Sequence, residues 1–302
     1  MTMRIIRTYF KGKVIFVSCS LIAAFSGCVT TEIPESELPD FVDKIVINAS
    51  FDNVNTMEIE VSNSAWAYTS DLPEVVSDAD LILTTATGEI PLTYNSSSRT
   101  YKGTSSAKIG EVYQLVASRK NYQTIRASCV IPEKVKSKEV AYIENGGIDV
   151  DGNKSDKVYI RFKDEPGPSY YILHFFYYST SADLFIPFDF PLTDPTLKSP
   201  ATLKLNDGGY LINDDLFSGQ SKEFAVVPPR GLVVGNPGIK YLVQLRSING
   251  DYYKYQSTLQ QYRDQQDIQN SGPFGSAVIV HSNINAGLGV FVGSTLESDS
   301  LR

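Results

Sequence analysis

The densest set of side chains that could perform chemistry in this 302-residue chain is an acidic loop. Asp149, Asp151, Asn153 and Asp156 place oxygen atoms at nearly alternate positions, and calcium prefers oxygen ligands in such loops. However, the loop's glycine stands at the fourth position rather than the sixth, and Ile160 occupies the twelfth, where calcium loops carry a carboxylate. Asp-Gly and Asn also favour turns. We therefore favour a turn between two strands, with calcium as the alternative.

Two histidines are the other candidates for acid–base chemistry. His174 lies within an aromatic strand predicted over residues 170–178, and His281 ends a strand predicted over residues 276–282. We expect each to be a strand residue with a local hydrogen-bond partner rather than a catalytic base. The chain has no Gly-x-Ser-x-Gly elbow, His-Glu-x-x-His pair or phosphate loop. A glycosidase pair among its 34 acidic residues cannot be identified from sequence. We expect a binding protein rather than an enzyme.

Aromatic residues are abundant, with 18 Tyr and 15 Phe. Both faces of the strand at residues 170–178 are largely aromatic or apolar, so it is either buried on both sides or offers one face to a partner. Core packing is the first expectation for these rings. Tyrosine also stacks on sugars and is enriched at protein interfaces. Tyr252, Tyr253 and Tyr255, at the start of a predicted helix, are therefore our candidate partner or ligand surface.

The N-terminus carries a targeting signal. Four basic residues precede an apolar stretch at residues 14–25, which is too short to span a bilayer as a stable helix. Ser26, Gly27 and Cys28 follow directly, in the arrangement of a bacterial lipoprotein signal. We predict removal of residues 1–27 and acylation of Cys28, which anchors a protein to a membrane without spanning it. An ordinary secretory signal or an N-terminal membrane anchor is the alternative.

The charge balance narrows the range of partners. The chain has a formal net charge of −7, and residues 1–27 contain four basic residues and no acidic one, so the rest is more acidic still. Nucleic acid is therefore an unsuitable partner, because its phosphates require a basic surface. Cys129 is the one cysteine left besides Cys28 after cleavage, and its strand-like neighbours predict a small buried hydrophobe rather than a reactive thiol. Residues 28–41 are acidic and proline-broken, which is typical of a flexible tether.

Short alternating strands predict the first domain, residues 42–133. In residues 56–62, for example, Met57, Ile59 and Val61 alternate with polar residues. Seven such strands separated by turns indicate an immunoglobulin-like β-sandwich without its cysteine pair. They are expected at residues 44–51, 56–62, 79–85, 90–94, 100–102, 112–118 and 122–131.

Residues 134–302 form the second predicted domain, a β-sandwich-like unit with an insertion and one helix. The helix is expected at residues 252–269, where Tyr255, Leu259 and Tyr262 recur with helical spacing. A proline-rich insertion covers residues 186–200, within a stretch near 180–220 whose role the pattern leaves open. Strands are expected at residues 138–143, 157–163, 170–178, 222–227, 240–248, 276–282 and 288–292. The fold class is thus mostly β.

Several segments across the chain carry a family resemblance. They include residues 44–48, 76–81, 110–115, 213–219 and 252–256, and the most specific is residues 282–291, Ser-Asn-Ile-Asn-Ala-Gly-Leu-Gly-Val-Phe. In these segments the chain resembles the uncharacterised Bacteroidota lipoproteins grouped as domain of unknown function 4249. Ala286 departs from the pattern, because glycine is expected there. The resemblance implies an outer-membrane or cell-surface lipoprotein, often found beside TonB-dependent receptors, and it supplies no catalytic residues.

Together these patterns predict an outer-membrane-anchored binding or accessory module, working beside a TonB-dependent transporter in nutrient uptake. The alternative is a surface glycan-binding lipoprotein that uses exposed tyrosines. Neither of these two predicted functions needs a cofactor. Calcium at the Asp149 loop is the one cofactor that the sequence leaves open as an alternative. Whether the protein faces the periplasm or the exterior is left open by the sequence.

Overall fold

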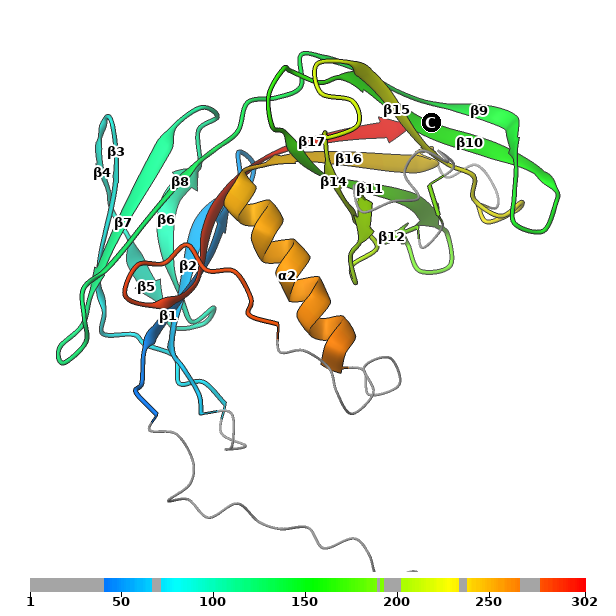
Figure 1. Ribbon diagram of the computed structural model, residues 1–302. Coiled ribbons are helices and arrows are strands. Elements are labelled where there is room, and N and C mark those ends of the chain that lie inside the picture. Colours follow the sequence, from blue (N-terminus) through cyan, green and yellow to red (C-terminus); the bar gives the residue numbers. More distant parts are fainter. Residues whose placement is uncertain (1–40, 67–71, 189–190, 193–201, 234–237, 267–277) are drawn as a thin grey trace, which may run out of the picture. The chain divides into compact units, whose positions relative to one another are not determined.

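The alternation of apolar residues predicts the strands of this chain well. The computed structural model describes residues 41–66, 72–188, 191–192, 202–233, 238–266 and 278–302 (Figure 1). They are mostly β, as predicted, with one described helix. Met57, Ile59 and Val61 are buried, and their polar neighbours Glu58 and Glu60 are not. No described helix is long and apolar enough to cross a membrane.

Eight strands occupy residues 45–130, where seven were expected. The predicted strand at residues 90–94 is in fact two short strands that belong to different sheets. Pro91 lies between them, and proline cannot donate the backbone hydrogen bond that would continue a ladder. The strands are β1 (Ile45–Phe51), β2 (Thr56–Asn63), β3 (Asp80–Thr85), β4 (Gly88–Ile90), β5 (Thr93–Asn95), β6 (Thr100–Ser106), β7 (Val112–Ser118) and β8 (Ile125–Val130).

The remaining elements include three short strands, β12 to β14, that the sequence did not predict. They are β9 (Ser137–Ile148), β10 (Lys154–Lys163), β11 (Tyr170–Ser179), β12 (Leu184–Pro187), β13 (Thr202–Lys204), β14 (Tyr210–Asn213), β15 (Ser221–Val226), β16 (Tyr241–Ile248), α2 (Gly250–Gln266) and β17 (Leu288–Leu301). The helix is confirmed to Gln266, and residues 267–269 of the prediction lie outside the described residues. Residues 278–282 are not a strand, so that prediction is wrong there, and residues 276–277 lie outside the described part.

Three sheets carry these strands. The largest has ten strands in the order β13-β14-β11-β16-β17-β1-β2-β6-β5, with β12 paired to β11. The other two have the orders β4-β3-β7-β8 and β15-β10-β9. Most neighbours are antiparallel, whereas β1 and β17 run parallel. One long sheet therefore extends through both halves of the described chain.

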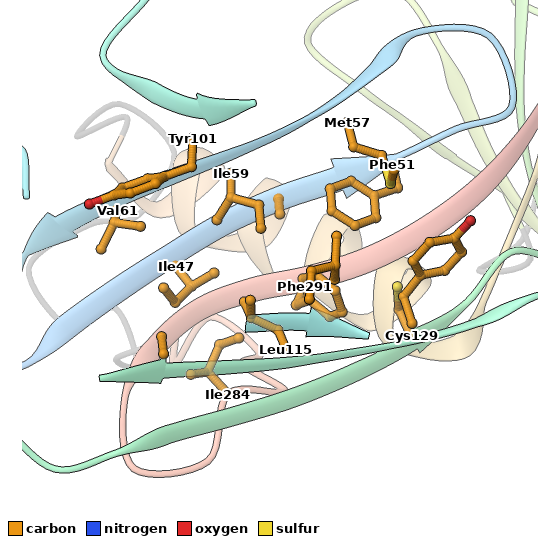
Figure 2. Close-up of a cluster of buried hydrophobic side chains, with 14 of the residues drawn as sticks. Ile47, Phe51, Met57, Ile59, Val61, Tyr101, Leu115, Cys129, Ile284 and Phe291 are labelled. Atoms are coloured by element: carbon orange, nitrogen blue, oxygen red, sulfur yellow. The ribbon is translucent and has the colours of Figure 1, made fainter. Parts of the chain in front are cut away.

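The first core lies between the β4-β3-β7-β8 sheet and strands β17, β1, β2 and β6 of the large sheet. Figure 2 shows its buried side chains, among them Ile47, Leu115 and Phe291. The Phe51 ring meets the Tyr113 and Phe291 rings edge-on, with centroids 5.8 and 5.2 Å away. Burial of such rings removes much apolar surface from water and stabilises this pair of layers.

The second core lies between the β15-β10-β9 sheet and the other end of the large sheet. Alternate residues of β10, namely Val158, Ile160 and Phe162, face Leu173 and Phe175 of β11. Strand β17 serves both cores: its first part pairs with β1, and residues 294–301 pair with β16. The division of domains at residues 133 and 134 stays a prediction, and residues 43–302 cluster as one compact unit.

The segment that leads into β17, and the start of that strand, are held by contacts to backbone atoms. The Asn283 side chain accepts the N–H of Phe291 and donates to its carbonyl, at 2.9 and 2.7 Å, as a neighbouring strand would. Gly289 has φ +94°, and a Cβ there would lie 2.1 Å from the carbonyl oxygen of Ile47. Ala286 adopts φ +64°, a left-handed conformation that glycine occupies far more easily. The fold therefore explains Asn283 and Gly289, and it shows why glycine would suit position 286 better than the alanine present there.

Candidate ligand-binding face

The acidic loop forms the predicted turn between β9 and β10. Asp149 Oδ1 accepts the N–H groups of Asp151 and Asn153 at 3.1 and 2.7 Å. Its Oδ2 accepts the N–H of Arg230 at 2.9 Å. The Arg230 N–H and the turn N–H groups hold the pKa of Asp149 below its usual value. These oxygens thus hold the turn together.

Asp156, the last of the predicted calcium ligands, has different partners. Its Oδ2 accepts hydrogen bonds from the Lys240 ammonium and, at 2.8 Å, from the Tyr241 hydroxyl. Burial alone would raise the pKa of Asp156, but these hydrogen bonds lower it. Across the described residues, no group of three or more acidic, histidine or cysteine side chains could hold a metal ion. These contacts confirm the predicted turn, and calcium binding stays an untested alternative.

Both histidines have the expected local partner. His281 Nε2 lies 3.0 Å from Asp251 Oδ1 at the start of α2, and His174 Nε2 lies 3.2 Å from Asp207 Oδ1. His281 is not in a strand: its backbone N–H donates to Thr258, so its segment runs along the helix.

The predicted tyrosine surface at the start of α2 packs against the large sheet instead of pointing freely outward. Asn249 caps the helix by accepting the N–H of Tyr252 at 2.8 Å. Tyr252 and Tyr253 contact a small buried cluster of Ile172, Leu205, Leu211 and Ile248, and the Tyr253 ring lies 4.7 Å from that of Tyr170. Burial raises the pKa values of Tyr253 and Tyr255. At least Tyr252 and Tyr253 therefore anchor the helix.

Beyond the helix, the same face of the sheet carries a row of half-buried aromatic rings. His174, Phe176 and Tyr178 alternate along β11 and so project from one face, while the intervening Phe175 is buried in the second core. The His174 and Phe176 rings are stacked with centroids 5.7 Å apart, and Tyr178 meets Phe185 of β12 at 5.5 Å. We call His174, Phe176, Tyr178 and Phe185 the aromatic face.

A groove of about 560 Å³ borders the aromatic face. Its lining includes Pro187, which pairs with Phe176 across β11 and β12, and Asp207, which pairs with His174. The other lining residues are Lys204, Leu205, Asn206 and Gly208. Aromatic rings beside exposed amide and carboxylate groups can stack on a ligand and hydrogen-bond to it at the same time.

The groove has a defined local geometry. Asp207 Oδ1 accepts a hydrogen bond from the N–H of Gly209 at 3.0 Å, and the same oxygen lies 3.2 Å from His174 Nε2. The hydrogen bond from His174 is the main reason that the pKa of Asp207 is lowered. A Cβ on Gly209 would lie 2.6 Å from His174 Nε2, so glycine allows the loop to lie directly against the ring. On the helix side, Gln260 Nε2 donates to Asn206 Oδ1 at 2.8 Å.

Sequence reasoning found only part of this site. The aromatic run of β11 was visible, and it does have one face in the core and one face turned away from that core. The loop at residues 204–209 was missed, because its link to His174 joins residues far apart in the chain. Cys28 lies outside the described residues. Cys129 is buried as expected, and burial raises the pKa of its thiol to about 12.

Comparison with known proteins adds a family but no activity. A family model described as a domain of unknown function, DUF4249, matches residues 29–300. None of the curated proteins matches the chain. The match covers every described strand except Leu301, the last residue of β17, in agreement with the sequence resemblance.

Proposed function

The chain belongs to the DUF4249 family, and from this premise we propose that it is a lipid-anchored binding module of the bacterial outer membrane. In this proposal Cys28 carries the lipid, residues 28–41 form the tether, and the folded part works beside a TonB-dependent transporter in nutrient uptake. The protein contributes recognition rather than catalysis.

The observation that carries the proposal is the aromatic face with its adjoining groove. Partly exposed rings held in fixed positions by a strand offer contact area at little cost in side-chain entropy. Phe176 and Tyr178 are less than fully buried, although they lie on the central strand of the second half. A partner that covers these two rings would remove their remaining apolar surface from water, and this burial would stabilise the complex.

Affinity capture from native membranes tests the accessory role. The tagged full-length protein is expressed in its own host, the membranes are solubilised in mild detergent, and bound proteins are identified by mass spectrometry. We expect a TonB-dependent receptor in stoichiometric amount. Recovery of the lipoprotein with no receptor would argue against the proposal.

A second candidate function is glycan binding at the same face. It is favoured by the position of Asn206 and Asp207 beside the rings, because sugars present hydroxyl groups at the edge of an apolar ring face. Affinity electrophoresis through gels containing different polysaccharides tests it. Retardation that disappears in Phe176→Ala and persists in Tyr262→Ala would support this function. Tyr262 is a suitable control because it is an exposed tyrosine on α2. Unaltered mobility across a broad panel would exclude glycan binding.

A further inference from the structure

Strand β17 has one edge that the described strands leave unpaired near its end. Residues 294–301 of this strand pair with β16 on one side, whereas β1 reaches only as far as Gly293 on the other side. Asn53 then takes the place of a strand for one residue. Its side chain accepts the N–H of Leu296 at 2.7 Å and donates to the Leu296 carbonyl at 3.2 Å. Beyond Leu296 no described strand continues this edge.

The backbone groups of Ser298 and Ser300 point to this open edge. In an antiparallel ladder, the hydrogen-bonding groups of successive residues alternate between the two sides of a strand. Leu296 directs its N–H and carbonyl toward Asn53 and away from β16, so Ser298 and Ser300 also direct theirs away from β16. Both serines are exposed. Two N–H groups and two carbonyls are therefore accessible to a further strand.

The open edge continues the aromatic face. Residues that pair across neighbouring strands lie on the same face of a sheet. Ser300 pairs with Leu242 of β16, which in turn pairs with Phe176 of β11. The neighbouring row leads in the same way from Ser298 to His174. A strand added to β17 would thus place alternate side chains beside the surface that the proposed function uses.

The opposite face of this edge is acidic. Glu297 Oε1 and Asp299 Oδ2 lie 3.1 and 2.6 Å from the ammonium of Lys138 on β9. One ammonium for two carboxylates leaves one negative charge, and the Asp299 side chain is 37% exposed. Because opposite charges on neighbouring strands attract each other, a lysine or arginine suits the position beside these carboxylates in an added strand.

Natural sheets usually protect an open edge with proline, a bulge or an inward-pointing lysine. Residues 296–301, Leu-Glu-Ser-Asp-Ser-Leu, contain neither proline nor lysine. We propose that a protein partner binds by adding an extended strand to β17 at Ser298 and Ser300. Its basic residues lie beside Glu297 and Asp299, and its apolar residues extend the aromatic face. The backbone hydrogen bonds supply affinity and the alternate side chains supply specificity.

A synthetic peptide, Thr-Lys-Val-Lys-Val-Lys-Thr, tests the edge directly. It carries a fluorophore and is titrated with the full-length protein in non-ionic detergent, and its anisotropy is measured. We expect saturable binding that is about tenfold weaker for Ser298→Pro/Ser300→Pro, because proline has no N–H to donate to the peptide. Ser298→Thr/Ser300→Thr keeps both N–H groups and should bind as the parent does. No saturable binding to the parent, or equal binding by the proline variant, would overturn the proposal.

Hydrogen exchange of the parent gives a second measurement that needs no substitution. The proline variant should fold, since neither N–H that it lacks pairs with β16 and proline is tolerated on an edge strand. In the free parent, we expect the amides of Ser298 and Ser300 to exchange faster than those of Glu297 and Asp299, which point toward β16. A saturating amount of the peptide should slow both serine amides. Unchanged exchange at these two amides would also count against strand addition.

Capture from native membranes separates this inference from the proposed function, on which it rests for the identity of the partner. Retention of a TonB-dependent receptor by the parent but not by the proline variant would support both. Equal retention by the two chains would overturn strand addition and leave the accessory role in place. If the parent retains no receptor, the accessory role fails, and the peptide titration decides whether the edge accepts a strand. A parent that sediments as a dimer, with a monomeric proline variant, would assign the edge to a second copy and overturn its assignment to a partner.

Discussion

Arg246 of β16 donates a hydrogen bond to Asp52, at the end of β1, with 3.2 Å between Nη1 and Oδ2. The same guanidinium nitrogen lies 2.8 Å from Ser294 Oγ on β17. Asp52 also organises the β1–β2 turn by accepting the N–H groups of Val54 and Asn55. The ion pair therefore ties the first hairpin of the chain to strands near its end, at the point where β17 passes from one core to the other.

Loss of the arginine should be strongly destabilising. In Arg246→Met the Asp52 carboxylate, 7% exposed, loses its counter-charge, and we expect the free energy of unfolding to fall by about 3 kcal/mol. The control is Lys102→Met, which breaks the exposed Lys102–Glu58 pair and should cost about 0.5 kcal/mol or less. Urea unfolding followed by tyrosine fluorescence measures both. Similar losses in the two variants would contradict the role given to Arg246.

The same carboxylate predicts a pH dependence. Burial alone would raise the pKa of Asp52, but the Asn55 and Val54 contacts and Arg246 outweigh it and lower the pKa below the usual 3.8. A carboxyl whose pKa is lowered by folding stabilises the protein above its unfolded pKa, and that stability is lost as pH falls through the folded pKa. We expect stability to decline below about pH 4, and Asp52→Asn to be less stable at pH 7 but to lose less stability on acidification. Parallel pH curves for parent and variant would be inconsistent with this.

Two substitutions around the start of β17, one just before the strand and one within it, should have opposite effects. Ala286→Gly relieves a left-handed φ of +64° and should stabilise the protein by about 0.5–1 kcal/mol. Gly289→Ala places a Cβ 2.1 Å from the Ile47 carbonyl oxygen and should cost several times more, or prevent folding. Melting temperatures of the two variants check this directly. If Ala286→Gly melts lower than the parent, the strain assigned to Ala286 is absent.

The Cys129 thiol should not react with thiol reagents in the folded protein. Its thiol is buried with a pKa raised to about 12, so little reactive thiolate forms at neutral pH. In a Cys19→Ser/Cys28→Ser chain it is the one remaining cysteine, and we expect no labelling by a thiol reagent until urea is added. Labelling of the native chain at the rate of a free thiol would show that this part of the first core is open.

The lipid anchor makes a separate prediction. Cys28→Ala removes the proposed acylation site, so the protein should fail to partition into the detergent phase when cells are fractionated. Cys129→Ala is the matched control and should partition like the parent. If Cys28→Ala remains in the detergent phase, an uncleaved apolar N-terminus rather than a lipid holds the protein to the membrane.

Local pattern predicted the strands and the helix, and contacts over long sequence distances decided the rest. Met57, Ile59 and Val61 revealed β2 because a half-buried strand must alternate. Strands β12 to β14 have three or four residues each, too few for a period to be recognised. Strand β17 was predicted only to residue 292, since its alternation weakens where it passes between the two cores.

The candidate site shows the same limit. Spacing placed the tyrosines of α2 on a helix, but it could not say that Tyr253 would stack on Tyr170 of a distant strand. In the same way, nothing near Asp207 in the sequence indicates that His174 is its partner. The helix or strand that carries each aromatic residue could be predicted from local spacing. The face of the sheet on which these residues gather could not, because it depends on the order of the strands in the sheet.

The most direct test of the central proposal is membrane capture with the aromatic face altered. Phe176→Ala/Tyr178→Ala is compared with the parent and with Tyr262→Ala, after urea unfolding has shown that all three are folded. We predict that the parent and Tyr262→Ala retain a TonB-dependent receptor, and that the double variant loses it. Equal retention by all three would contradict the assignment of the aromatic face as the binding surface.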